Sequence, residues 1–379
     1  MSLQRSGSLH ADPAGPRPAG GSRRPTAAHG APDFASSLPR AFHTSSHAHL
    51  VALRRAFSRE QAVSGQALAR ALGRSRTAVW KGIEQLRQLG YRLEGSPRRG
   101  YRLLEIPDIP FPWEVELVRR GRFGCPLTYL FEVGSTNDEA RRLALQGAPE
   151  GTVVVADRQL RGRGRRGREW LSPPGGLWFS VVLRPQVCPS RAGLLAMAAG
   201  LAVLRAASSL APAAPLQLKW PNDVLAGEGG KLAGVLVELE GDHERIRHAV
   251  AGIGINMQDV SPPGGRWEPD RPVPVGLARF GCSASRAQVL AAVLWELEQL
   301  YDALHRTPEA VVGELERCLA WKGQAVSVQM DRYCVHGRLR GLDPATGALV
   351  LEGPDGRLTT VTAGDVSLRP GAGSATEEG

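Results

Sequence analysis

The chain has 379 residues, 42% of them hydrophobic and 22% charged, which is typical of a soluble globular protein with two or three domains. It contains no run of 18 apolar residues, which argues against a membrane-spanning helix. The net charge of +10 is uneven: residues 1–105 carry 17 basic and 6 acidic side chains, whereas residues 106–379 carry 30 and 31. One basic module therefore precedes a near-neutral body.

The five cysteines lie far apart in the sequence and form no C-x-x-C pair. This spacing predicts neither a zinc site nor a disulfide framework, so we expect no structural metal. The start of the chain lacks the apolar stretch of a secretory signal. We therefore expect a reducing, cytoplasmic setting and no membrane partner.

Both ends of the chain differ in composition from the rest. Residues 1–47 are rich in Gly, Pro, Ala and Ser without an apolar period, which predicts a disordered extension, and residues 371–379 resemble a frayed tail. A mitochondrial transit peptide would share the arginines and the scarcity of acids, but six prolines argue against its amphipathic helix. A wrongly assigned start codon is a further alternative.

A helix-turn-helix pattern follows the extension. Two short helices are predicted at residues 66–72 and 76–89, with Gly73 in the turn between them. Ser64 and Ser75 are placed to cap the N-termini of these helices. This layout is typical of DNA-binding helix-turn-helix domains.

A wing and a basic charge favour DNA binding by residues 48–105. Alternating strands at 91–93 and 101–103 flank a turn with two arginines, and the segment holds 12 basic and 4 acidic side chains. Phosphate contacts dominate affinity for DNA, although a small packing domain with a solvated basic face is the alternative. The candidate DNA contacts are Ser64, Ser75, Arg76, Thr77, Trp80, Lys81, Arg98 and Arg99.

Residues 106–320 alternate buried strands with helices and read as one domain. Its predicted strands lie at 152–156, 177–183, 216–219, 234–238 and 249–255, and its predicted helices at 191–210 and 287–305. From residue 321 to residue 370 the pattern changes to four short strands, at 325–328, 335–341, 347–352 and 358–361. A small β-barrel is the natural packing for these four strands.

The segment Arg161–Arg168 interleaves five arginines with three glycines. It contains G-x-G-x-x-G, but two prolines soon follow instead of a helix, and no acid occurs between Glu169 and Asp223, so a dinucleotide fingerprint is excluded. Glycine lets the backbone wrap closely, and arginine offers forked donors to carboxylate or phosphate. We expect an anion-binding loop that is mobile when empty, because its charges repel one another.

A second motif, Lys219-Trp-Pro-Asn-Asp223, ends a predicted strand. The chain has 43 arginines and only four lysines, so a lysine kept at a strand end is notable. A compact ammonium suits one oxygen of a reacting phosphate. Downstream, Gly230–Glu238 and Gly252–Met257 read as strands interrupted by glycine, which marks a bulge or close approach to a ligand.

Taken in order, these motifs and Gly134-Ser-Thr-Asn137 resemble the biotin protein ligase family, and the winged helix in front resembles its bifunctional, repressor (BirA-type) branch. The resemblance covers roughly residues 48–370. It implies an α+β (α/β-like) catalytic domain of the class II synthetase/biotin-ligase type, with an N-terminal winged helix-turn-helix and a C-terminal SH3-like β-barrel. It also implies that ATP and biotin form biotinyl-AMP, with Mg²⁺ accompanying ATP, and that biotin is then transferred to a lysine of a biotin carboxyl carrier protein.

The resemblance also implies roles for individual residues. Lys219, Arg163 and Arg165 are the expected catalytic residues. The expected biotin contacts are Ser135, Thr136, Asn137, Gln159, Arg163, Gly164, Arg165, Lys219, Gly234 and Gly252. The expected ATP contacts are Arg165, Arg168, Trp170 and Asn256.

Three further expectations concern partners and alternatives. The bifunctional branch implies a palindromic operator and a homodimer that forms when biotinyl-AMP is bound. A DNA-binding regulator that senses biotinyl-AMP without useful transfer is one alternative, which Lys219 and the arginine loop argue against. A lipoate-type ligase is another, although the Gly-Arg loop and the Lys-Trp-Pro-Asn-Asp motif are more typical of biotin ligases.

Overall fold

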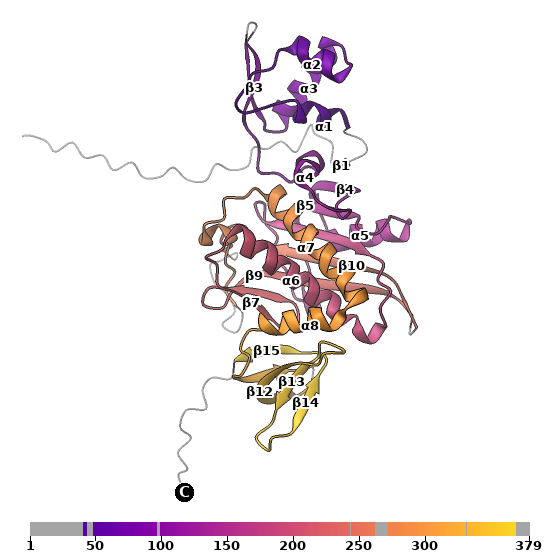
Figure 1. Cartoon of the computed structure of the whole chain (residues 1–379), viewed down its shortest axis with the longest axis vertical. Helices are drawn as coiled ribbons and strands as arrows, with labels where there is room; N and C mark the ends of the chain where they lie inside the picture. The colour runs from indigo at the N-terminus through magenta and orange to yellow at the C-terminus, as the bar shows by residue number, and fades with distance from the viewer. Residues whose placement is uncertain are drawn as a thin grey trace, which may run out of the picture.

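The computed structural model describes residues 41–43, 48–96, 99–242, 244–261, 272–330 and 332–368. These residues form three parts along the long axis: a winged helix at one end, a central sheet with helices, and a small β-domain at the other end (Figure 1). Arg98, most of the predicted extension and the predicted C-terminal tail lie outside the described residues.

The winged helix matches its prediction closely. Its second and third helices begin at caps foreseen from the sequence: Ser64 Oγ accepts from Ala67 N and Ser75 Oγ accepts from Ala78 N, both at 3.1 Å. Gly73 between them takes the left-handed φ of 59° that a tight turn favours. The elements are α1 (Ala48–Arg55), α2 (Gly65–Leu72), α3 (Arg76–Gln88), β2 (Arg92–Ser96) and β3 (Gly100–Glu105).

The central domain is built on an eight-stranded sheet in the order β1-β4-β5-β6-β10-β9-β8-β7. Its named strand pairs are antiparallel except β4 with β5, which run parallel. The strands are β1 (Ala41–His43), β4 (Leu127–Val133), β5 (Val153–Gln159), β6 (Leu177–Leu183), β7 (Leu216–Lys219), β8 (Asp223–Ala226), β9 (Gly230–Gly241) and β10 (Ile246–Ile255).

Helices cover both faces of this sheet. Strand β5 shows why: Val153 and Val155 face the main core, while Val154 faces a smaller core with Ala140 and Ala144 of α5. Helices α6 and α7 pack against each other in the main core (Figure 1). The helices are α4 (Pro112–Val118), α5 (Thr136–Leu145), α6 (Gly193–Leu210), α7 (Arg286–Arg306) and α8 (Pro308–Arg317).

Helix α6 is the most apolar helix of this core. Among the described residues, the span Pro189–Leu210 is the one helix long and apolar enough to cross a membrane, by length and composition alone. In the fold, 67% of its most apolar window is buried, and α7, α8 and the sheet lie against it. A core helix passes the same test, so the finding fits its packing.

The C-terminal domain has one strand more than expected. Its sheet has the order β14-β13-β12-β11-β15. The unforeseen β15 is short and partly polar, so its own sequence does not predict a strand. It is stabilised as a strand by pairing with β11, almost 40 residues away in the chain. The described residues give no pairing of β14 with β15 that would close this SH3-like unit. The strands are β11 (Ala325–Gln329), β12 (Cys334–Leu342), β13 (Leu349–Glu352), β14 (Leu358–Val361) and β15 (Asp365–Leu368).

The prediction that residues 1–47 form a disordered extension is wrong for Ala41–His43. These residues form β1, which pairs antiparallel with β4 at the edge of the central sheet. The Phe42 ring is fully buried and meets several aromatic rings of the central domain. A three-residue strand has no period to reveal it, so this burial is a tertiary effect.

Candidate active site and DNA-binding surface

The start of α5 and the end of β5 form the first part of the candidate active site. Strands β4 and β5 are parallel, and the register places Val133 beside Gln159. The motif that follows β4 therefore meets Gln159, whose Oε1 accepts from Thr136 N at 2.8 Å and from Thr136 Oγ1 at 3.0 Å. Ser135, the N-cap residue of α5, is buried and makes no side-chain cap bond.

Asn137 is held against the sheet below it. Its Oδ1 accepts from Ser180 Oγ of β6 at 2.6 Å, and its Nδ2 donates to Glu238 Oε2 of β9 at 2.7 Å. A Cβ on Gly252 would lie 2.1 Å from Asn137 Oδ1, so only glycine permits this approach. The predicted biotin residues Asn137 and Gly252 are thus in contact in the fold.

Trp170 lies across two other glycines of the sheet. A Cβ on Gly234 would come within 2.9 Å of its ring, and one on Gly254 within 2.5 Å of its Nε1. That indole nitrogen is buried without a hydrogen-bond partner in the part of the chain that the structure describes. Lys231 Nζ lies 5.0 Å from the ring centroid, within the range of a cation–π contact. The indole therefore lies between the Lys231 ammonium and the strand backbone at Gly234 and Gly254. Together with Gly252, these two glycines form a patch of sheet without side chains, which we call the glycine floor.

The arginine loop contacts several carboxylates of the protein, and its mobility without ligand stays a prediction. Arg163 forms a two-pronged ion pair with Asp138 of α5, at 2.6 and 2.9 Å, and lies 3.5 Å from Glu238. The hydrogen bonds from Arg163 hold the pKa of the Asp138 carboxyl below its usual value. Arg163 is thereby linked through Glu238 to Asn137.

Three more arginines of the loop meet one carboxylate of the C-terminal domain. Asp365 of β15 contacts Arg165 at 3.5 Å, Arg166 at 3.6 Å and, most closely, Arg168. Arg165 Nη1 also lies 3.4 Å from Asn222 Oδ1, and burial lowers the pKa of its guanidinium. The loop thus bridges the central and C-terminal domains.

Lys219 lies at the turn of the β7–β8 hairpin, opposite Asp223 in the strand register. The Trp220–Pro221 peptide in this turn is cis. Burial lowers the pKa of the Lys219 ammonium below its ordinary value, and Asp223 works against that shift. Asp223 also pairs with Lys231, with Oδ1 and Nζ 2.7 Å apart. Asp223 is therefore ion-paired with Lys231 and lies opposite Lys219 in the strand register.

Asn256, an expected ATP contact, has a clear structural partner. Its buried side chain donates from Nδ2 to the Lys231 carbonyl oxygen at 3.0 Å. This bond fixes the backbone beneath the Trp170 contact. The loop glycine Gly164 donates its N–H to the Arg168 carbonyl oxygen at 2.7 Å, which closes the loop on itself.

Sequence reasoning assigned no role to several residues that hold the site together. Ser180 left a signal, because it is a lone hydroxyl in an otherwise apolar strand, Leu177–Leu183. Glu238, Asp223 and Lys231 stood inside recognised motifs without a role. Asp365 left no local signal, since its partners are about 200 residues away in the chain.

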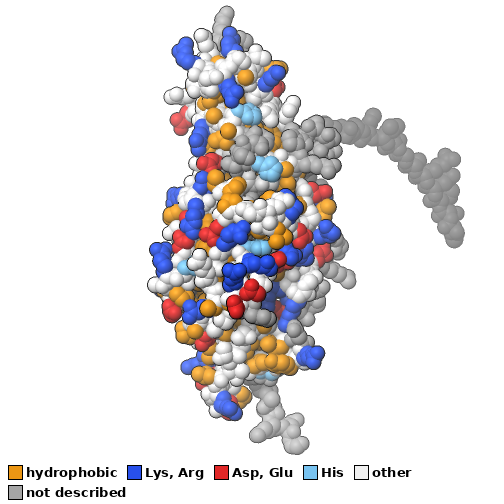
Figure 2. Space-filling view, turned by 90° about the vertical axis from the view of Figure 1, so that its right-hand side faces the viewer, with side chains coloured by type: hydrophobic (Ala, Val, Ile, Leu, Met, Phe, Trp, Pro, Cys, Tyr) orange, Lys and Arg blue, Asp and Glu red, His pale blue; other side chains and the backbone are white. Residues whose placement is uncertain are grey.

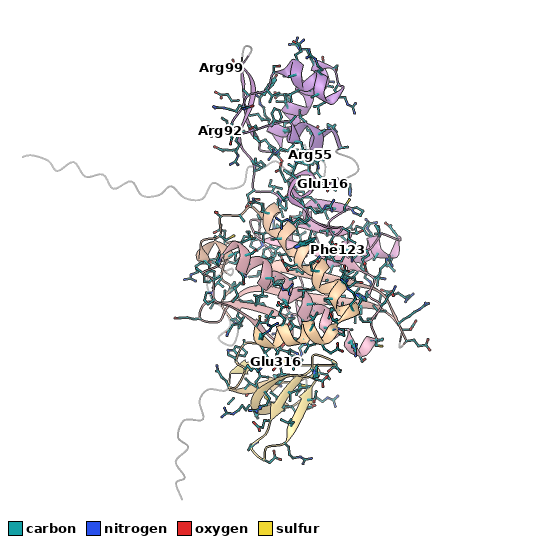
Figure 3. All side chains as sticks on the ribbon, viewed as in Figure 1. Arg55, Arg92, Arg99, Glu116, Phe123 and Glu316 are labelled. Atoms are coloured by element: carbon teal, nitrogen blue, oxygen red, sulfur yellow. The ribbon has the colours of Figure 1, made fainter. Side chains whose placement is uncertain are left out.

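The predicted DNA-binding residues of α3 lie on its solvent face. Arg76, Thr77, Trp80 and Lys81 are exposed, with Trp80 at 52%, while the opposite face packs inward through Val79, Ile83 and Leu86. Arg99 projects from the wing, away from the body of the molecule (Figure 3). Ser64 and Ser75 use their hydroxyls as helix caps.

The surface view sets this end of the molecule apart from its middle. Basic side chains are spread over the winged helix at the top, whereas basic and acidic side chains lie together across the middle (Figure 2). Within residues 106–379, acids such as Asp138 and Asp365 pair with arginines, and the near-equal numbers of acids and bases make this part neutral overall.

Comparison with known proteins supports this architecture part by part. Residues 132–256 match the biotin/lipoate A/B protein ligase family, residues 52–102 match an HTH domain, and residues 323–369 match the biotin protein ligase C-terminal domain. A biotin--[acetyl-CoA-carboxylase] ligase of Paracoccus denitrificans is 35% identical over 60% of this chain and 95% of its own length. The chain belongs to the biotin protein ligase family.

Among the bifunctional relatives that resemble this chain, the ligase/repressor BirA of Salmonella typhimurium is 31% identical over 81% of the chain and 93% of its own length. BirA of Bacillus spizizenii is 42% identical, but the match spans only 61% of that protein. The biotin protein ligase of Aquifex aeolicus in complex with biotin and ATP aligns with a TM-score of 0.54 at 31% identity, covering 64% of this chain and 98% of that one.

Proposed function

We propose that this chain is a bifunctional biotin protein ligase. It activates biotin with ATP to biotinyl-AMP and then biotinylates a lysine of a biotin carboxyl carrier protein. Its winged helix binds operator DNA and makes the protein a biotin-responsive repressor. The observation that carries the enzymatic part is the convergence of Lys219, Arg165 and Arg168 beside a polar cluster on the glycine floor of the sheet.

The polar cluster is the proposed biotin site. Ser135, Thr136, Asn137 and Gln159 place amide and hydroxyl groups at the start of α5, where they can pair with the ureido group of biotin. Gly234 and Gly252 let Trp170 and Asn137 lie directly on the sheet at the base of this site. Arg163, with Gly164 in the loop backbone, is proposed to exchange its contact with Asp138 for the carboxylate of biotin.

The second group of residues is proposed to carry adenylation. A carboxylate oxygen of biotin attacks the α-phosphorus of ATP, a new C(O)–O–P link forms, and pyrophosphate leaves. Negative charge builds on the phosphoryl oxygens, and Lys219 and Arg165 are fixed, half-buried cations that can stabilise it. Arg168, Trp170 and Asn256 are proposed to line the nucleotide site, with Trp170 beside the adenine.

In the second step the lysine amine of the carrier attacks the acyl carbon of biotinyl-AMP. An amide bond forms, AMP leaves with the electrons of the broken bond, and the amine gives up a proton. The loop arginines are proposed to keep the adenylate in place until the carrier arrives. We expect this chemistry in the cytoplasm, where the free thiols of the described cysteines fit a reducing setting.

Magnesium is proposed to arrive with ATP. The described residues include no group of three or more His, Cys, Asp or Glu side chains that could hold a metal ion. Mg²⁺ keeps much of its hydration shell in nucleotide sites, so it needs few protein ligands. A cation bound mainly by the ATP phosphates and water is therefore compatible with these residues. Bound in this way, Mg²⁺ would neutralise part of the triphosphate charge.

For the regulatory function, the exposed face of α3 and the wing arginine Arg99 are proposed to contact a palindromic operator. A palindrome presents two half-sites and calls for two recognition helices, so we propose a homodimer that forms when biotinyl-AMP is bound. A gel-shift experiment with and without biotin and ATP tests this part. A shift that is indifferent to both ligands would contradict biotin-responsive regulation.

Transfer of radiolabelled biotin to purified carrier protein, with ATP, tests the enzymatic proposal. We expect ATP-dependent label on one lysine. Label from lipoate instead of biotin would indicate a lipoate-type ligase. Tight retention of biotinyl-AMP without transfer would indicate a regulator that only senses the adenylate.

A further inference from the structure

A buried hydrogen-bonded network crosses the boundary between the winged helix and the central domain. Glu114 of α4 accepts from Arg54 Nε at 2.7 Å and from Tyr91 OH at 2.6 Å, both through Oε1, and its Oε2 lies 3.3 Å from Arg54 Nη2. Tyr91 OH in turn accepts from Trp113 Nε1 at 2.7 Å. Two residues of this network belong to each domain.

This network is shielded from solvent. The side chains of Arg54 and Glu114 are only 13% and 9% exposed, and Tyr91 is 2% exposed. Burial, with Glu114 as the next contribution, raises the pKa of the Tyr91 hydroxyl well above its ordinary value, so the hydroxyl stays a donor. Removing one member would leave buried polar groups unpaired, which is costly in a dry site.

The central-domain side of the network is rigid. Trp113 stacks on Phe111 with ring centroids 4.7 Å apart and meets Phe42 edge-on at 5.5 Å. Phe42 belongs to β1, which is itself paired with β4. The aromatic packing and the strand pairing therefore anchor the indole that donates to Tyr91.

On the other side, the network holds the DNA-binding helix from two directions. Tyr91 follows α3 closely, and its N–H donates to the carbonyl oxygen of Leu86 in that helix. Arg54 lies on α1, which packs against α3. The position of Glu114 relative to these two side chains therefore sets the direction of α3.

We propose that Glu114 is a positioning residue that holds the winged helix in one orientation on the catalytic domain. The recognition helix is then presented to DNA at an angle that the catalytic domain sets, rather than from a freely tethered module. Orientation is a property of the chain itself, and only its consequence for DNA rests on the proposed function.

Glu116, two residues after Glu114 on the same helix, offers a matched control. Arg55 and Glu116 also connect α1 to α4, but their nearest atoms are 3.9 Å apart and their side chains are 55% and 26% exposed (Figure 3). An exposed pair at that distance contributes little. Glu116 also pairs with Arg119 at 2.9 Å, so Glu116→Gln removes a carboxylate and a local ion pair at the same helix without touching the buried network.

The test compares the full-length wild type with Glu114→Gln, Tyr91→Phe and Glu116→Gln. Amide hydrogen exchange across residues 104–118 and small-angle scattering report the domain junction. We expect faster exchange in this segment and a broader scattering envelope for Glu114→Gln, a smaller change for Tyr91→Phe, and none for Glu116→Gln. A variant that only destabilised the winged helix would also raise exchange at the buried amides of α2 and α3.

The functional measurement is binding to an operator duplex, beside the rate of biotin transfer. Glu114→Gln should lower duplex affinity about fivefold or more, because a loosened domain must be oriented upon binding, and should leave the transfer rate unchanged. Wild-type exchange and scattering in both Glu114→Gln and Tyr91→Phe would overturn the proposal. If the wild type bound no duplex, DNA binding would fail as a function, while the exchange measurement would still decide the orientation.

Discussion

Two basic segments of this protein differ in whether their cations are paired with carboxylates. In the loop Arg161–Arg168, four arginines contact carboxylates from α5, β9 and β15. On α3, Arg76 and Lys81 are exposed and form no ion pair with any residue that the structure describes. One set of cations is held in place by the protein's own acids, and the other faces solvent.

Paired cations suit a small anionic ligand, and unpaired cations suit duplex DNA. A small anion bound in a closed site needs donors at fixed positions, and a carboxylate of the protein can hold them there until the ligand replaces it. A duplex presents a line of phosphates, and cations that are already neutralised would release fewer counterions from it. Substitutions in each segment therefore test whether it serves the ligand that its pairing suggests.

The largest effect is expected at the active site. Lys219→Ala removes a half-buried cation from the reacting phosphate, so we expect adenylation to slow by about 10²–10³-fold with the fold intact. Pyrophosphate release with biotin and ATP measures this rate. Lys322→Ala is the control, since Lys322 is an exposed lysine paired with Glu316. A wild-type rate for Lys219→Ala would remove this lysine from the mechanism.

On the DNA-binding surface, we expect Arg76→Ala and Lys81→Ala each to weaken duplex binding at unchanged transfer rate. Each should also reduce the slope of log affinity against log salt by about one if the side chain meets a phosphate. Titrations at several salt concentrations measure both quantities. Arg357→Ala, an exposed arginine of the C-terminal domain, is the control. Unchanged slopes in both variants would move the DNA contact elsewhere.

A smaller effect concerns the order of the loop. Asp365→Asn removes the charge that gathers Arg165, Arg166 and Arg168, so their mutual repulsion should loosen the loop. We expect faster hydrogen exchange at the loop amides of residues 164 and 168, which are hydrogen-bonded within the loop. Asp355→Asn changes a turn of the same domain and should leave the loop amides alone. Equal exchange in both variants would mean that the backbone alone holds the loop.

The mildest test is pH dependence. Because burial lowers the pKa of Lys219 below its ordinary value of 10.5, its ammonium loses its proton at a lower pH than a free lysine does. The kcat/KM for ATP, which reports the free enzyme, should therefore fall as pH rises, at a pH below 10.5. Lys219→Arg should move this fall to higher pH, since arginine keeps its charge. A fall at the same pH in both proteins would assign it to another group.

Local chemistry made much of the architecture predictable. The helix-turn-helix was predictable from Ser64, Ser75 and Gly73, because helix capping and left-handed turns depend on a few neighbouring residues. The long apolar strands and helices α6 and α7 were foreseen within a few residues of their bounds for the same reason. Strands β1 and β15 were missed, since three or four residues carry too short a pattern. Strands β4 and β8 and helices α4, α5 and α8 were not predicted either.

The sequence by itself determined the three modules and the chemistry of the motifs, because helix caps, strand periods and the Gly-Arg and Lys-Trp-Pro-Asn-Asp segments are local. Only the tertiary structure decided which charges meet: Arg165 with Asp365, Arg163 with Glu238, and Arg54 with Glu114. These partners are separated by about 60 to 200 residues. Their meeting depends on how sheets and domains pack, and no local propensity encodes that.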